Sequence, residues 1–220
     1  MAETATATPA ARKEQTPGDF APELFAAFST IRSIARTINC GFDAPEIVFV
    51  GKKGAGKSTL IECILGHTML DPGPTLRPVE IRMVNNAACE TPRVTVLRDP
   101  AAPADFPVDE VDVPLVSVPE RLKARNVVRT AVPMRVLYEA RYCWDMTLYD
   151  TPGLLRATDA DAAAVEAAVL ALARPAQRLV VCVEEAGPWD LVESVDVAAR
   201  VDPRRERTLF VFNKLATFVA

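Results

Sequence analysis

The feature that most constrains this chain is a glycine-rich loop between the pattern of a buried strand and the pattern of a helix. Residues 51–58 read Gly-Lys-Lys-Gly-Ala-Gly-Lys-Ser and fit G-x-x-x-x-G-K-[ST] without substitution. The apolar run 46–50 before the loop predicts a buried strand, and residues 59–65 after it predict a helix. Glycines let successive backbone N–H groups point at a polyphosphate, and the start of the helix adds positive potential. The sequence therefore predicts a nucleoside-triphosphate site; the alternative is a glycine-rich turn with solvated lysines.

Three further positions fit the same chemistry. Lys57 is expected to reach the β- and γ-phosphates, and the Ser58 hydroxyl to bind Mg²⁺. The apolar strand 146–149 runs into a D-x-x-G motif, in which Asp150 would hold Mg²⁺ through water and the N–H of Gly153 would bond the γ-phosphate. Thr75 lies in a loop rich in Pro and Gly and could close on the metal and orient the attacking water. A tight turn after a strand and an ordinary loop threonine are the alternatives.

Strand patterns and helix patterns alternate along the rest of the chain. We expect strands at 79–84, 93–97, 134–140, 146–149, 179–183 and 208–212, and helices at 120–125, 159–173 and 191–199, with a Pro/Asp-rich loop over 99–116. Ser117 and Thr158 are predicted as helix N-caps, with Pro119 in the first turn of its helix. This alternation predicts an α/β fold, a P-loop NTPase three-layer sandwich with a mostly parallel central sheet.

The first forty residues divide into two parts. Residues 1–19 are Ala, Thr, Pro and charge, which predicts a disordered tail; Glu3 and Glu14 count against a transit peptide as the alternative. Apolar residues then recur at helical spacing and predict one amphipathic helix over 20–40. The domain assignment is therefore a tail over 1–19 and one nucleotide-binding α/β domain over 20–220.

Composition excludes several other classes of protein. Half of the 220 residues are hydrophobic and 25% are charged, which suits a packed core. The net charge of −4 does not favour nucleic-acid binding by bulk charge, and no apolar run approaches the roughly 20 residues of a membrane span. The five cysteines form no CxxC pair, so we expect buried thiols in a reducing compartment and no disulfide or zinc site.

Several motifs resemble the dynamin-type large GTPases. The T-x-R-P motif of that family is matched by Thr75, Arg77 and Pro78, and the D-x-P-G motif by Asp150, Pro152 and Gly153. The V-D-P…R-T run is matched at 201–203 and 207–208, and the N-terminal helix at 20–40. Residues 141–143 and 184–190 are most similar to the dynamin-related proteins of plant and algal chloroplast division. The resemblance covers about residues 20–215.

This resemblance implies a function, partners and a location. The chain would bind GTP with Mg²⁺, hydrolyse it by in-line attack of water, form a homodimer through the GTPase face, and drive membrane constriction in chloroplast or organelle division. It would be cytoplasmic and act at the cytosolic face of the plastid outer envelope. Membrane association would be peripheral, through partners or through segments missing here. Because no stalk follows Ala220, we expect either a truncated product or a chain that depends on a partner to cover the helix over 20–40.

The resemblance also assigns the site residue by residue. The implied catalytic residues are Lys57, Thr75 and Lys53, and the implied metal ligands are Ser58, Thr75 and, through water, Asp150. The implied nucleotide-binding residues are Gly51, Lys52, Lys53, Gly54, Ala55, Gly56, Lys57, Ser58, Thr59, Asp150, Gly153, Asn213 and Lys214.

Two departures from the family pattern leave other functions open. The family reads guanine with [NT]-K-x-D, but here Asn213 and Lys214 are followed by Leu215 and Ala216, so the carboxylate is missing. Dynamins usually carry polar residues where this chain has Lys53 and Gly54. Lys53 could supply a positive charge, obstruct the water, or simply face solvent. The alternatives to a GTPase are therefore a catalytically impaired nucleotide-binding scaffold and a P-loop ATPase.

Overall fold

The computed structural model describes residues 44–99, 101, 106, 108–188 and 192–216, together with residues 27, 30, 31, 33–35 and 37. All of the described residues between 27 and 37 are helical, in agreement with the predicted helix over 20–40. The predicted tail over 1–19, the remaining positions of that helix and Trp189 lie outside the described residues.

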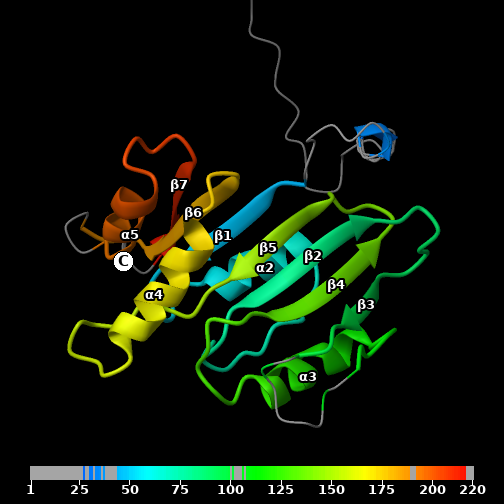
Figure 1. Ribbon diagram of the computed structural model, residues 1–220, viewed down its shortest axis with the longest axis horizontal. Helices are drawn as coiled ribbons and strands as arrows, with labels where there is room; N and C mark the ends of the chain where they lie inside the picture. The colour runs from blue at the N-terminus through cyan, green and yellow to red at the C-terminus, as the bar shows by residue number, and fades with distance from the viewer. Residues whose placement is uncertain are drawn as a thin grey trace, which may run out of the picture.

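The described strands form one seven-stranded sheet in the order β3-β4-β2-β5-β1-β6-β7. The strands are β1 (Glu46–Val50), β2 (Val79–Asn85), β3 (Arg93–Val96), β4 (Met134–Ala140), β5 (Met146–Asp150), β6 (Arg178–Glu185) and β7 (Thr208–Asn213). Strand β1 pairs in parallel with β5 and β6, β6 with β7, and β2 with β4; the β2–β5 and β3–β4 pairs are antiparallel. The sheet is mostly parallel, as predicted, and Figure 1 shows β7 and β3 at its opposite edges.

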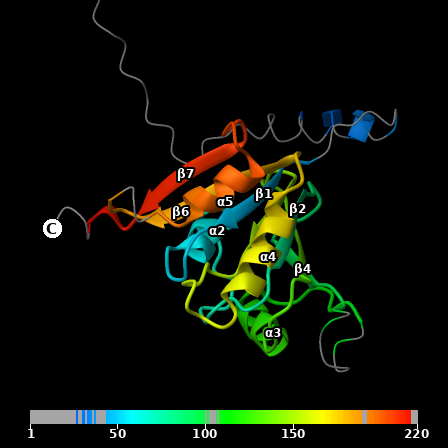
Figure 2. The same cartoon turned by 60° about the vertical axis from the view of Figure 1, so that its left-hand side comes forward.

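Helices cover the two faces of this sheet and complete a three-layer α/β sandwich (Figures 1 and 2). They are α2 (Lys57–Leu65), α3 (Val118–Arg125, after a 3₁₀ turn at Leu115–Ser117), α4 (Ala162–Ala173) and α5 (Ser194–Val201). One buried apolar cluster joins α2 and α3 to the sheet, and a second joins α4 and α5 to the opposite face of β1, β5 and β6. The P-loop NTPase architecture is therefore confirmed.

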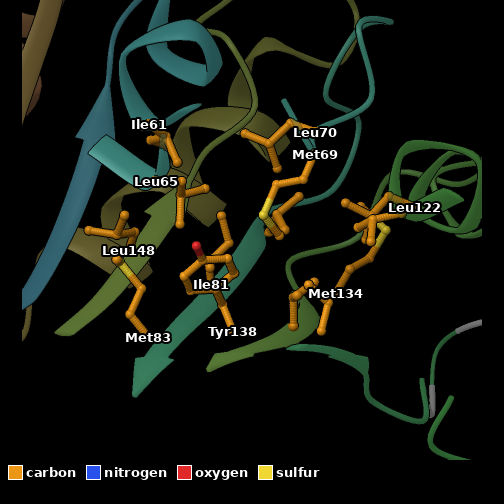
Figure 3. Packing of buried hydrophobic residues seen from close by; sticks show 14 of the residues in the cluster. Ile61, Leu65, Met69, Leu70, Ile81, Met83, Leu122, Met134, Tyr138 and Leu148 are labelled. Carbon is orange, nitrogen blue, oxygen red and sulfur yellow. The ribbon is translucent and has the colours of Figure 1, made fainter. Parts of the chain in front are cut away.

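The larger of these clusters packs α2, the helix that follows the phosphate loop, against the sheet, and Figure 3 shows part of it. Strand β4 alternates buried and more exposed positions, and β2 does so along most of its length, so one face of each strand enters the core. Ile61 of α2, Ile81 of β2 and Leu148 of β5 are fully buried there. Burying such side chains removes apolar surface from water, which fixes α2, and with it the loop that precedes α2, against the sheet.

Some local predictions need correction. Helix α4 begins at Ala162 and its N-cap is Asp161, so Thr158 is not the cap. Ser117 does occupy the N-cap position of α3, but its side chain makes no capping hydrogen bond. Among the described cysteines, Cys63 is exposed and the other three are buried free thiols. The prediction of buried thiols was therefore wrong for Cys63.

None of the helices in the described part of the chain combines the length and the apolar character required to cross a membrane.

Candidate functional site

The glycine-rich loop joins the end of β1 to the start of α2. Gly54 and Gly56 have φ angles of 84° and 98°, a region that residues with a Cβ rarely adopt. Gly56 is also the N-cap of α2, and no side chain caps this helix. The N–H groups of the first turn therefore have no side-chain acceptor, which is the arrangement that binds an anion at a helix N-terminus.

Lys57 is buried at the first position of α2 and points back across the loop. Its Nζ donates to the backbone carbonyls of Gly51 and Lys52, both at 3.0 Å. Burial lowers the pKa of Lys57, and the charges of Asp150 and Glu184 oppose this change. The loop is thus closed around one cationic side chain, as the phosphate-binding prediction requires.

Ser58 and Asp150 meet at the carboxyl ends of the strands. The Ser58 hydroxyl donates to Oδ2 of Asp150 at 2.7 Å, although the two residues are far apart in sequence. Burial raises the pKa of Asp150 to about 6, against the hydrogen bond from Ser58 and the charge of Lys57. Among the described residues, the buried Oδ1 atom of Asp150 has no hydrogen-bond partner. A buried acceptor beside a serine hydroxyl is the donor set that suits a hard divalent cation.

A cavity of about 700 Å³ opens beside this pair. Predicted site residues that border it are Lys53, Gly54, Gly56, Lys57, Ser58, Thr59, Thr75 and Gly153. Asp150 borders a smaller adjoining cavity of about 10 Å³, which Thr75 also lines. The structure therefore brings the phosphate loop, the Thr75 loop and the D-x-x-G turn to one place. Gly51, Lys52, Ala55, Asn213 and Lys214 do not line the large cavity.

The turn after β5 lies directly against the phosphate loop. A Cβ built on Gly153 would stand 2.5 Å from the Cα of Lys53 and 2.6 Å from its backbone nitrogen. The N–H of Leu154 donates to the carbonyl of Gly51 at 3.0 Å. Only glycine leaves room for this close approach, which explains its place in the motif.

Asn213 connects the end of β7 to the phosphate loop. Its Nδ2 donates to the carbonyl of Ala55 at 3.2 Å and would lie 2.1 Å from a Cβ on Gly56. Lys214 has a φ of 57° and forms an ion pair of 2.5 Å with Glu185. Ala216, at the position of the family's carboxylate, is exposed. Of the [NT]-K-x-D motif, the Asn and the Lys are therefore present, and the Asp is replaced by Ala216.

The Arg of the T-x-R-P motif points into the protein and away from the cavity. The guanidinium of Arg77 donates to both carboxylate oxygens of Asp99, at 2.6 and 2.9 Å, and both side chains are 1% exposed. It also donates to the carbonyls of Arg125 and Val132. The sequence placed Arg77 in the T-x-R-P motif but did not predict its ion pair with Asp99. Asp99 is one of several Asp residues in the predicted loop over 99–116, and no local pattern distinguishes it as the partner of an Arg.

The V-D-P…R-T run also has a structural role. The Asp202 carboxylate accepts hydrogen bonds from the backbone N–H of Arg207 and from the Thr208 hydroxyl. The Arg207 guanidinium donates to the carbonyls of Ala173 and Val201, the last residues of α4 and α5. These contacts fix the start of β7 and therefore the position of Asn213 at its end.

Comparison with known proteins agrees with this geometry. Residues 47–215 match the sequence profile of the dynamin family. The chain is 30% identical over 219 residues to dynamin-like protein B of Dictyostelium discoideum and 28% identical over 220 residues to dynamin-like protein ARC5 of Arabidopsis thaliana. These alignments cover 87% and 88% of this chain and 27% of each relative. Rat dynamin-1 is 26% identical over 194 residues, which is 80% of this chain and 21% of the relative.

The chain thus spans about a quarter of the length of these relatives, and the matched part is the part that carries the phosphate loop and the seven-stranded sheet. The family match extends over most of the residues that the structure describes. The chain therefore belongs to the dynamin family and folds as a dynamin-type GTPase domain.

Proposed function

We propose that this chain binds GTP with Mg²⁺ and hydrolyses it to GDP and phosphate. The observation that carries the proposal is the junction of the phosphate loop with the end of β5, where Lys57 is buried and Ser58 is bonded to Asp150. Membership of the dynamin family supports the same reaction.

The metal site would consist of Ser58, Thr75 and, through water, Asp150. The Oδ1 atom of Asp150, which has no hydrogen-bond partner among the residues that the structure describes, and the Ser58 hydroxyl bonded to its other oxygen support this donor set. Bound there, Mg²⁺ would neutralise charge that develops on the β- and γ-phosphates. Mg²⁺ keeps several waters and uses few protein ligands, which suits a site built from two hydroxyls and one carboxylate.

Three residues would bind the phosphates and position the attacking water. Lys57 would exchange its two backbone carbonyl partners for phosphate oxygens and stabilise negative charge in the transition state. The N–H of Gly153 would bond the γ-phosphate from the turn that contacts Lys53. Thr75, which borders both cavities, would orient the attacking water. Orientation of the water acts in the transition state and should affect turnover more than binding.

Base recognition would fall to the end of β7 and the segment that follows it. Asn213 would bond the purine N7 and Lys214 would lie along the ring. A carboxylate at position 216 would accept from the N1–H and the amino group of guanine, but Ala216 has none. Losing this charge-assisted contact should cost about 2–4 kcal/mol of guanine preference. We therefore propose only modest discrimination between GTP and ATP.

A catalytically impaired scaffold remains a second candidate, and the residues at positions 53 and 54 favour it. Apart from its two chain neighbours, no described residue has an atom within 4 Å of a Cβ built on Gly54, and glycine itself has no polar side chain to place water or bind a cation. The Lys53 side chain borders the cavity and is exposed. Lys53 would either supply the positive charge that a bound cation supplies in the family, or obstruct the water.

We further propose that the chain acts as a homodimer through its nucleotide-binding face in membrane constriction, at the cytosolic side of a plastid envelope. Self-assembly in the dynamin family supports the dimer. The similarity to dynamin-like protein ARC5 and the motifs shared with chloroplast-division proteins support the location. Fluorescent tagging in a plastid-bearing cell tests the location: a ring at the division site supports it, and a uniform signal at other membranes contradicts it.

Phosphate release from GTP and from ATP, each with Mg²⁺ or with EDTA, tests the enzymatic proposal. We expect Mg²⁺-dependent release from GTP by the parent, loss of release in Lys57→Ala, and parental release in Lys123→Ala, whose lysine is exposed on α3. Tight GTP binding without release would favour the scaffold. Faster release from ATP would favour the ATPase.

A further inference from the structure

The two peptide groups that flank Thr75 are bonded to the same side chain. Asn126 donates from Nδ2 to the carbonyl of Pro74 at 2.9 Å, on one side of Thr75. Its Oδ1 accepts from the N–H of Leu76 at 3.0 Å, on the other side, and from the N–H of Arg77 at 3.1 Å. Nδ2 also donates to the Asp71 carboxylate at 3.4 Å. One amide therefore makes four hydrogen bonds to this segment, two before Thr75 and two after it.

This arrangement fixes the backbone of Thr75. The φ angle of a residue is set by its peptide plane on the N-terminal side, and ψ by the plane on the C-terminal side. Because both planes are bonded to one rigid amide, Asn126 sets the direction of the Thr75 Cβ through the backbone, separately from the interaction between the Thr75 side chain and Asp150. A side-chain amide suits this task, since its oxygen can accept from two N–H groups while its nitrogen donates to a carbonyl. The orientation of the amide follows from these partners.

Asn126 is itself held firmly. It is 8% exposed and forms the C-cap of α3, where its N–H donates to the carbonyls of Leu122 and Lys123. Leu122 is fully buried in the core beside Met134 of β4 (Figure 3). The Arg77–Asp99 pair fixes the residue that follows the loop, and Glu62 of α2 accepts the N–H groups of Met69 and Leu70 ahead of it.

We infer that Asn126 is a positioning residue for hydrolysis: it sets the direction of the Thr75 side chain by bonding the peptide groups on both sides of it. The inference rests on the proposed GTPase function and assigns a task to a residue that the family motifs do not include. Asn126 touches neither phosphate nor water in this account. It acts through the backbone of Thr75, so its removal should change turnover and leave the affinity for GTP near that of the parent.

Amide hydrogen exchange, measured by NMR without nucleotide, tests the structural half of the inference. In Asn126→Ala the amides of Leu76 and Arg77 should exchange about tenfold faster or more, because each loses its acceptor. The amide of Ile81 in β2 serves as the reference for global opening and should change by less than about twofold. Asn86→Ala is the matched control, since Asn86 also bonds a backbone N–H and a carboxylate but lies beyond the far end of β2. Unchanged exchange at Leu76 and Arg77 overturns the inference.

Turnover in a double-mutant cycle tests the functional half. Asn126→Ala should lower kcat for GTP by about tenfold or more with the Kd for GTP within about threefold, and Asn86→Ala should leave both near the parent. In the Thr75→Ala background, Asn126→Ala should lower kcat by less than about twofold further, since the Thr75 hydroxyl that Asn126 positions is already absent. If the loss of kcat in the double variant equals the product of the two single losses, Asn126 acts independently of Thr75 and the inference is overturned.

A second variant separates the two arms of the amide. Asn126→Asp keeps acceptors for Leu76 and Arg77 but places a carboxylate oxygen against the Pro74 carbonyl and the Asp71 carboxylate, the two groups to which Nδ2 donates. We expect the amides of Leu76 and Arg77 to exchange as slowly as in the parent, but kcat for GTP to be lowered about fivefold or more. A parental kcat would contradict the inference that Thr75 is positioned only when the peptide groups on both of its sides are bonded. If the parent releases no phosphate from GTP, the proposed function fails, whereas the exchange experiment still decides whether Asn126 holds the loop.

Discussion

Replacing Arg77 with Met should destabilise the domain strongly, because the ion pair that it forms with Asp99 is buried. The guanidinium makes two hydrogen bonds to the Asp99 carboxylate and others to the carbonyls of Arg125 and Val132. In Arg77→Met the carboxylate stays buried and, within the part of the chain that the structure describes, keeps one hydrogen-bond donor, the N–H of Ala101 at 3.0 Å. An unpaired buried charge is therefore left behind.

The size of the effect follows from this geometry. Removing one partner of a buried ion pair costs about 3–5 kcal/mol, against a total stability of about 5–15 kcal/mol for an ordinary domain. For a domain of this size, about 2–4 °C of Tm accompanies each kcal/mol, so we expect a fall of about 6–20 °C. Replacing both partners, as in Arg77→Met with Asp99→Leu, should recover at least half of the loss because no charge is then stranded.

Urea unfolding followed by circular dichroism measures the loss. Arg93→Met is the matched control: Arg93 pairs with Asp112 at 2.7 Å, but the two side chains are 49% and 59% exposed. Solvent screens such a pair, so the unfolding midpoint should not shift measurably. If Arg77→Met unfolds at the midpoint of the parent, or if the double variant is no better than the single one, the buried pair does not support the Thr75 loop as we argue.

The same pair predicts a dependence of stability on pH. Burial alone would raise the pKa of Asp99, but the hydrogen bonds from Arg77 and from the Ala101 N–H, together with the charges of Arg77 and Arg125, outweigh it, and the pKa lies below its ordinary value. The contribution of Asp99 is therefore full above the unfolded pKa of about 3.9 and is lost as the pH falls through the lower folded value. Between neutral pH and that range, Asp99→Asn should show a smaller loss of unfolding free energy on acidification than the parent. An equal loss in both proteins would remove Asp99 from the acid response.

Three shorter predictions concern the site. Thr75→Ala should lower kcat by about two orders of magnitude with GTP affinity within a few-fold, as phosphate release and titration measure; an unchanged kcat would remove Thr75 from the mechanism. Ala216→Asp should raise the GTP/ATP affinity ratio by roughly 30- to 1000-fold in competitive displacement, and a parent that already prefers GTP by about a thousandfold would show that another acid reads the base. Gly153→Ala should weaken triphosphate binding and lower Tm, because its Cβ would meet the Lys53 backbone at 2.5 Å, whereas Gly187→Ala, with its nearest contact at 3.8 Å, should change neither; equal behaviour of the two variants would contradict the close approach.

Much of the fold could be predicted from the sequence because its strands are short apolar runs bounded by breakers. Strand β4 has the predicted bounds, and β1 ends where the glycine loop begins. The phosphate loop itself is a local pattern, so its residues and their order were evident. The start of α4 was less predictable: Ala-rich segments favour helix throughout, and the chain leaves Thr158 outside the first turn.

The supports of the Thr75 loop could not be predicted in the same way. Asn126 lies 49 residues from Arg77 in sequence, and Asp99 lies 22 residues from it. Neither belongs to a repeating pattern, because each is a single polar side chain that becomes buried only when α3 packs on the sheet. The inward direction of Arg77 likewise depends on a partner, not on the motif that contains it. Tertiary pairing of isolated polar residues is the information that a single sequence lacks.

Binding of a nucleoside triphosphate by the loop over residues 51–58 should depend on Lys57. Isothermal titration of the parent, Lys57→Ala and Lys123→Ala with GTP and Mg²⁺, beside thermal unfolding of each protein, measures this dependence. We expect binding by the parent and by Lys123→Ala, binding weakened by about 30-fold or more in Lys57→Ala, and similar unfolding temperatures for all three. Parental affinity in Lys57→Ala would show that the loop does not bind the triphosphate through Lys57.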